Sequence, residues 1–204
     1  MREGVTTVDF LSPVGDQRPG FAAYASGWSR TLISPIKPVS DRLLAAVDAL
    51  RASHVNGEAE VAQFHIDADA AVAWYLSRDQ VEIDFFRDFF SHPAVLGALT
   101  MVSGQKDGQL GFHGEAPFVS FGHLANRIQR GGAYKSFAGT DAEVLKLTTD
   151  FAAAAIGLRF SESAVWESEE PWSSWFLDVA WDYSLFWLDK RSRIATVLLS
   201  TDTD

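Results

Sequence analysis

The sequence contains no cysteine among its 204 residues. Disulfide bonds, thiolate zinc sites, iron–sulfur clusters and cysteine nucleophiles are therefore excluded. The chain also lacks any run of about 18 apolar residues, so no transmembrane helix is expected. Its first residues include early acids and no uninterrupted apolar segment, which is untypical of a secretory signal peptide. We therefore expect a cytoplasmic protein with no membrane contact.

Positive charge is scarce, most of all in the last third of the chain. The formal net charge is −10, and residues 141–204 hold 12 acidic but only 5 basic residues. Between Glu162 and Leu188 there is no base at all. Such a charge distribution opposes binding to a nucleic-acid backbone and would attract basic partners. Negative charge also serves solubility alone, so a partner surface needs further support.

The composition is that of a globular domain, because 47% of the residues are apolar and 22% are charged. The length suits a single domain, and we treat residues 1–204 as one. Residues 1–38 are rich in Gly, Pro and Ser, which predicts an extended lead-in with a short strand near 21–28. Residues 158–204 predict a strand-rich, acidic C-terminal part.

Apolar periodicity predicts four helices, over residues 40–53, 79–91, 121–130 and 141–156. The last has the clearest boundaries, because Thr140 and Glu143 have capping-box spacing and Gly157 follows its end. Strands are expected over 60–66 and 194–201, within 97–119, and throughout the C-terminal part. This order indicates an α+β fold, in which an antiparallel sheet with a C-terminal β-meander packs one face against about four helices.

The segment WFLDVAWDYSLFWLD, residues 175–189, combines tryptophans with aspartates. In a strand, alternation would place the tryptophans on one face and Asp178 and Asp182 on the other. Four residues of strand span about 13 Å, which exceeds the roughly 5–9.5 Å of glycosidase carboxylate pairs. We therefore predict a core strand with an acidic outer face and a bend near 182–184.

The preceding segment, WESEEPWSSW, clusters acids and tryptophans around Pro171. Tryptophan is enriched at the centres of protein interfaces, so this segment is the leading candidate for a partner-binding surface. A solvated loop with one buried tryptophan is the alternative. The predicted partner-binding residues, including the two strand aspartates, are Glu167, Glu169, Glu170, Trp172, Trp175, Asp178 and Asp182.

Histidines supply a weaker pattern. His65 and Asp67 form an H-x-D motif, and His113 lies downstream, which are the residue types of an open Fe(II) site. A predicted helix interrupts the span, and the motif is common by chance, so we predict no metal or cofactor. Glu82 falls on the apolar arc of the Phe-rich helix, where it could be a desolvated carboxylate or a first-turn acid.

A single basic stripe, His123, Arg127 and Arg130, lies opposite the apolar face of the predicted helix over 121–130. Together with the backbone of Gly131–Gly132 it could hold an anion. It could equally be a solvated face paired with acids of the same chain.

No complete catalytic motif occurs in the sequence. We therefore predict a non-enzymatic binding protein, most concretely an acidic immunity- or inhibitor-type protein that neutralises a basic protein such as a toxin or nuclease. Two alternatives stay open. One is a metal-dependent enzyme or hydrolase that uses His65, Asp67 and a distal histidine, and the other is a small-anion binder that uses Arg127 and Arg130. No pattern indicates an oligomeric state.

Overall fold

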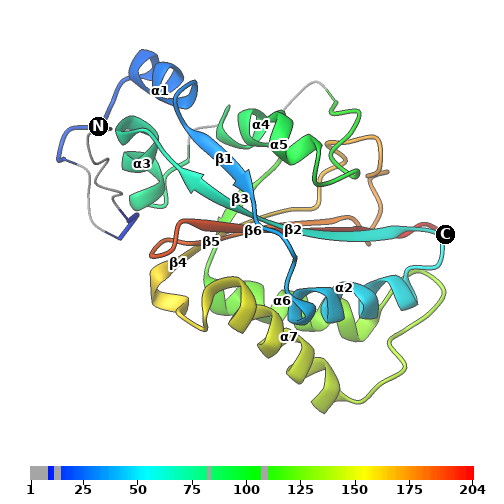
Figure 1. The fold of residues 1–204 in the computed structure, drawn as a ribbon. Helices are drawn as coiled ribbons and strands as arrows, with labels where there is room; N and C mark the ends of the chain where they lie inside the picture. The colour runs from blue at the N-terminus through cyan, green and yellow to red at the C-terminus, as the bar shows by residue number, and fades with distance from the viewer. Residues whose placement is uncertain (1–8, 12–14, 82–83, 107–109) are drawn as a thin grey trace.

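The computed structural model describes residues 9–11, 15–81, 84–106 and 110–204. Its centre is a six-stranded antiparallel sheet in the order β1-β2-β6-β5-β4-β3 (Figure 1). Neighbouring strands β4, β5 and β6 follow one another in the chain, so the α+β class and the C-terminal β-meander are confirmed. The strands are β1 Leu32–Pro35, β2 Glu58–Asp67, β3 His113–Glu115, β4 Ser163–Ser168, β5 Tyr183–Asp189 and β6 Ile194–Thr201.

Helices cover both faces of the sheet, which Figure 1 shows nearly edge-on. Helices α2, α6 and α7 lie on one side, and α1, α3, α4 and α5 lie on the other. The prediction of helices on one face only is therefore wrong. The helices are α1 Phe21–Trp28, α2 Asp41–Ser53, α3 Ala70–Ser77, α4 Asp84–Phe90, α5 Pro93–Leu96, α6 Pro117–Arg130 and α7 Asp141–Ile156, with a 3-10 turn η1 at Phe160–Glu162.

Strand β5 explains why both faces are covered. Its Leu185 and Trp187 belong to the core beneath α2, α6 and α7, whereas Phe186 belongs to the core on the other side. There, the ring of Phe186 lies 5.0 Å from that of Phe89 and 5.4 Å from that of Phe86, both in the Phe-rich α4. A strand buried on both faces is apolar at nearly every position, so alternation alone cannot describe it.

Two predicted helices have nearly the expected boundaries. In α7 the Thr140 hydroxyl accepts from the Glu143 N–H, the Glu143 carboxylate accepts from the Thr140 N–H, and Gly157 ends the helix in the left-handed region. In α2 the Ser40 hydroxyl accepts from the Arg42 N–H. These side chains satisfy N–H groups that the first helical turn leaves without partners.

Other predicted boundaries are wrong. The segment 21–28 is helix α1 and not a strand, and helix α3, which Asp69 caps, was not predicted. The helix predicted over 79–91 begins at Asp84, after a turn in which Asp79 has a φ of 56°. Glu82 lies outside the described residues. Helix α6 begins earlier than predicted, at Pro117, a residue that suits the first turn of a helix.

The strand predicted over 175–189 is wrong for its first half. Only Tyr183–Asp189 is strand, and residues 169–182 form an irregular loop. The buried Asp182 carboxylate accepts hydrogen bonds from the backbone N–H groups of Leu177, Asp178 and Val179. This local turn satisfies backbone donors that a strand would direct to its neighbour, so the side chain competes with the sheet.

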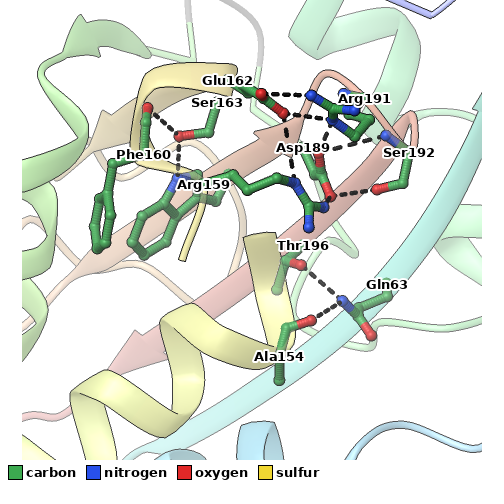
Figure 2. Close-up of polar contacts among 11 residues, drawn as sticks. Gln63, Ala154, Arg159, Phe160, Glu162, Ser163, Asp189, Arg191, Ser192 and Thr196 are labelled. Carbon is green, nitrogen blue, oxygen red and sulfur yellow. Dashed lines mark hydrogen bonds and ion pairs between the residues drawn. The ribbon is translucent and has the colours of Figure 1, made fainter. Parts of the chain in front are cut away.

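A tight turn joins the end of β5 at Asp189 to the start of β6 at Ile194 (Figure 2). The Asp189 carboxylate accepts from the Arg191 N–H at 3.1 Å and forms an ion pair with Arg159, which follows α7 (Figure 2). Below it, the Gln63 amide donates to the Thr196 hydroxyl and to the Ala154 carbonyl, joining α7 to the sheet (Figure 2). Within the described residues, no helix is long and apolar enough to cross a bilayer.

Candidate functional site

A cavity of about 730 Å³ opens between α6, strands β3 to β5 and the ends of the 169–182 loop. Helix α6 supplies one wall and the sheet supplies another. The main polar and aromatic lining residues are His113, His123, Asn126, Arg127, Arg130, Glu167, Glu169, Trp181 and Tyr183. The structure thus brings the predicted basic stripe and two of the predicted partner-binding glutamates to one place.

Helical spacing explains the α6 wall. His123, Arg127 and Arg130 are separated by four and three residues, so they lie along one face of the helix. Leu124 and Ile128, on the opposite face, are fully buried in the core shared with α2 and α7. The amphipathic pattern therefore turns the basic stripe toward the cavity.

Glu167, on β4, is the buried centre of the site and is only 4% exposed. One carboxylate oxygen accepts from the Tyr183 hydroxyl and the other accepts from Nδ1 of His123, both at 2.8 Å. Burial and then the neighbouring Glu167 raise the pKa of Tyr183 well above its usual range. Tyr183 consequently stays a hydroxyl donor, and Glu167 orients the imidazole ring so that Nδ1 faces inward.

Arg127 is built into the wall and is not a solvated surface residue. Its guanidinium lies 4.6 Å from the centre of the Tyr183 ring, and Nη1 donates to the Ala180 carbonyl at 3.1 Å. The second terminal nitrogen forms an ion pair with Glu169, on the rim. Only 17% of the Arg127 side chain is exposed, compared with 68% of Glu169. The arginine is therefore fixed, whereas its carboxylate partner reaches into solvent.

The prediction that Gly131 and Gly132 supply backbone donors for an anion is wrong. The Gly131 N–H donates to the Arg127 carbonyl and the Gly132 N–H donates to the Lys135 carbonyl, each at 3.0 Å. Gly131 has a φ of 68°, and a Cβ on Gly132 would clash with the Asp202 carboxylate. These glycines are needed for a tight turn and a close approach of the chain.

The predicted partner-binding residues divide into two groups. Glu167, Trp172 and Asp182 are buried, and the Trp172 indole donates to the Ser184 hydroxyl at 2.9 Å. We therefore correct their assignment, because a side chain enclosed by its own fold cannot contact a partner. The exposed members of the set are Glu169, Glu170, Trp175 and Asp178.

The 169–182 loop is held by side chain to backbone contacts with the segment 101–106, beside which it lies in Figure 1. The Ser173 hydroxyl donates to the Met101 carbonyl at 2.7 Å, and Ser174 donates to the Ser103 carbonyl at 3.0 Å. Lys106 donates its ammonium to the Phe176 carbonyl at 3.0 Å. Together with the Asp182 turn, these contacts order a segment that has no regular secondary structure.

Sequence reasoning missed Leu177 and the role of Tyr183. Leu177 is 57% exposed in the 169–182 loop. Strand alternation would instead place it with the tryptophans, on the face that was expected to be buried. Tyr183 reaches Glu167 because Glu167 pairs with Leu185, two residues further along β5 on the same face. This neighbourhood depends on strand register, which no local pattern in the sequence reveals.

The weak metal candidates are far apart. His65 and Asp67 lie on β2, whereas His113 lies on β3, with β6, β5 and β4 between them. Four steps between strands correspond to about 19 Å. Asp67 forms an ion pair with Arg193 at 2.9 Å. In the described part of the chain, no group of three or more His, Asp or Glu side chains could hold a metal ion.

Comparisons with protein-family models, with curated proteins and with solved structures found no significant match. The function is therefore inferred from the residues of this chain alone.

Proposed function

We propose that the protein is a non-enzymatic binding protein of the inhibitor or immunity type, which neutralises a basic protein partner such as a toxin or nuclease in the cytoplasm. The supporting observation is the ordered 169–182 loop, which exposes large apolar side chains among carboxylates. Trp175 is 38% exposed and Leu177 is 57% exposed, although the same loop buries Trp172 and Phe176.

Preordering is the first argument for an interface. A flexible loop loses conformational entropy when it binds, and that loss weakens the complex. Here Ser173, Ser174, Lys106 and Asp182 already hold the backbone in place. Asp178 adopts a φ of 65°, a conformation that costs free energy for a residue other than glycine, so the surrounding contacts must hold the loop in this shape.

Charge is the second argument. Glu170 and Asp178 are exposed in the loop, and no base occurs between Glu162 and Leu188. Carboxylates around exposed apolar side chains resemble the polar rim and apolar centre of a protein interface. Complementarity then requires a basic surface on the partner.

A matched pair of leucine variants tests the proposal. Leu177→Ala removes an exposed apolar side chain from the loop, and Leu145→Ala removes one of almost equal exposure, 56%, from α7. Binding would be measured by calorimetry against basic proteins encoded beside this one. We expect Leu177→Ala to weaken binding at least fivefold, as for a residue at the centre of an interface, and Leu145→Ala to leave it unchanged.

Two results would contradict the proposal. Equal binding by both variants would mean that the loop is not the contact surface. Failure of the wild-type protein to bind any of these basic proteins would remove the proposed partner class itself.

A further inference from the structure

We propose that the cavity between α6 and the 169–182 loop is a binding site for an oxyanion, the phosphate or carboxylate group of a metabolite-sized molecule. This site goes beyond the protein-binding function proposed above and does not depend on it. It uses the cavity wall, whereas protein binding uses the exposed side chains of the loop.

The first argument is that two side chains of the cavity wall, one guanidinium and one imidazole, have no polar partner in the described residues. Arg130 and His113 both line the cavity and are exposed. Within the described ranges, neither side chain takes part in a hydrogen bond or an ion pair, although the protein has an excess of carboxylates. A guanidinium on a concave surface is suited to a planar or tetrahedral oxyanion, to which it can donate two parallel hydrogen bonds.

Arg127 provides a second, preordered donor. Stacking on Tyr183 and the hydrogen bond to the Ala180 carbonyl fix its guanidinium within the wall. Its remaining partner, Glu169, is mostly exposed. An exposed carboxylate contributes little to an ion pair because solvent screens it. A bound oxyanion can therefore replace the Glu169 carboxylate on Arg127 without moving the arginine.

The buried carboxylate of the site does not oppose this role. Both oxygens of Glu167 are occupied, one by Tyr183 and the other by His123, and its side chain is only 5% exposed. Nδ1 of His123 contacts Glu167, and its half-exposed ring lines the cavity. Within the described residues Nε2 of this ring has no hydrogen-bond partner, so it is free to contact a bound molecule.

The size of the cavity argues for more than an isolated inorganic ion. A volume of about 730 Å³ is within the range of sites for small organic molecules. The partly exposed Trp181 provides apolar surface in the same cavity. The organic part of the molecule packs on this ring while its anionic group contacts the arginines.

The test is a titration of isotope-labelled protein with sodium phosphate and, separately, with sodium citrate, at constant ionic strength maintained by sodium chloride. The reporter is the indole N–H resonance of Trp181, which is assigned by its loss in Trp181→Phe. We expect a saturable shift with at least one of the two anions. The anion that binds more tightly identifies the phosphate or the carboxylate class.

Two pairs of variants assign the binding to this cavity. Arg130→Gln should weaken it roughly tenfold, the effect of losing one charged hydrogen-bonding partner. Arg42→Gln, which removes an exposed arginine from α2, should not weaken it. Glu169→Gln should tighten binding severalfold because it removes the competing carboxylate. Glu170→Gln makes the same change in charge at the next residue and should have no effect.

Three results would overturn the inference. The first is that neither phosphate nor citrate gives a saturable shift of the Trp181 signal. The second is equal weakening by Arg130→Gln and Arg42→Gln, because this would indicate nonspecific attraction to net charge. The third is equal affinity in Glu169→Gln and Glu170→Gln, because Glu169 would then not occupy the position of the ligand.

Discussion

The buried His54 makes the stability of the fold depend on pH. It follows α2 and is 4% exposed, with its ring nitrogen Nδ1 3.2 Å from the Ser53 hydroxyl. Burial lowers the pKa of His54 below its usual value of 6.5, although the nearby Asp202 opposes the shift. The folded protein therefore favours the neutral imidazole.

This shift predicts the direction of a pH effect. Above pH 6.5 the histidine is neutral in both states, and its contribution to stability is fully present. As the pH falls below 6.5, the unfolded chain takes up the proton first, so the free energy of unfolding decreases. Between about pH 7.5 and about pH 5, the free energy of unfolding should therefore fall less in His54→Gln than in the wild-type protein, as measured by denaturant unfolding. His113→Gln, at an exposed position, is the control. If the free energy of unfolding of His54→Gln depends on pH as strongly as that of the wild-type protein, the argument is contradicted.

Individual residues also determine what could be predicted about the site. The α6 face of His123, Arg127 and Arg130 follows from helical spacing, which the sequence displays directly. The triad of Glu167, Tyr183 and His123 joins two strands and a helix, so it depends on register and packing. Glu167 was expected on a surface because it belongs to the same acidic segment as Glu169 and Glu170, yet two hydrogen-bond donors compensate its burial.

The 169–182 loop is the element on which both proposals depend, and Asp182 is its main internal anchor. The buried carboxylate accepts three backbone N–H bonds and one from the Thr201 hydroxyl. Asp182→Asn retains the volume and can keep one amide oxygen on the three N–H groups while Nδ2 donates to the Thr201 hydroxyl, but it removes the negative charge that strengthens these hydrogen bonds. We expect the free energy of unfolding to fall by about 1.5 kcal/mol, the difference between charged and neutral hydrogen bonds at a buried site. Denaturant unfolding would measure this change.

Asp178→Asn is the matched control for this prediction. It makes the same chemical change four residues away at an exposed position, and asparagine tolerates the left-handed backbone conformation found there. We expect a change within about 0.5 kcal/mol, as at most surface positions. Similar losses in the two variants would mean that Asp182 does not hold the loop.

Elements with complete local signals were predicted well, and those shaped by tertiary contacts were not. Helix α7 has an N-cap, a capping box and a terminal glycine, so its boundaries follow from neighbouring residues. The segment 175–182 has the alternation of a strand, but Asp182 satisfies its backbone donors locally. Coverage of the second sheet face depended on four helices, of which α1, α3 and α5 were not predicted as helices.

At the scale of the whole molecule, net charge and fold contribute differently to the proposed binding of a partner. The net charge of −10 produces a long-range field, whereas the ordered loop provides a specific surface. Several carboxylates are already paired within the fold, including Glu162 with Arg191 and Asp189 with Arg159. The field near the loop therefore depends most on exposed carboxylates such as Glu170, for which the described structure shows no ion pair.

If the partner is basic, association should depend on salt through this field. We expect the association rate constant to fall about tenfold between roughly 0.05 and 0.5 M salt, with little change in the dissociation rate. Glu170→Lys should slow association and flatten its salt dependence, whereas Asp48→Lys, an equal change in charge on α2, should have a smaller effect. Stopped-flow mixing would measure both rates. Equal effects of the two variants would show that net charge and not the loop attracts the partner, and an association rate independent of salt would exclude electrostatic steering altogether.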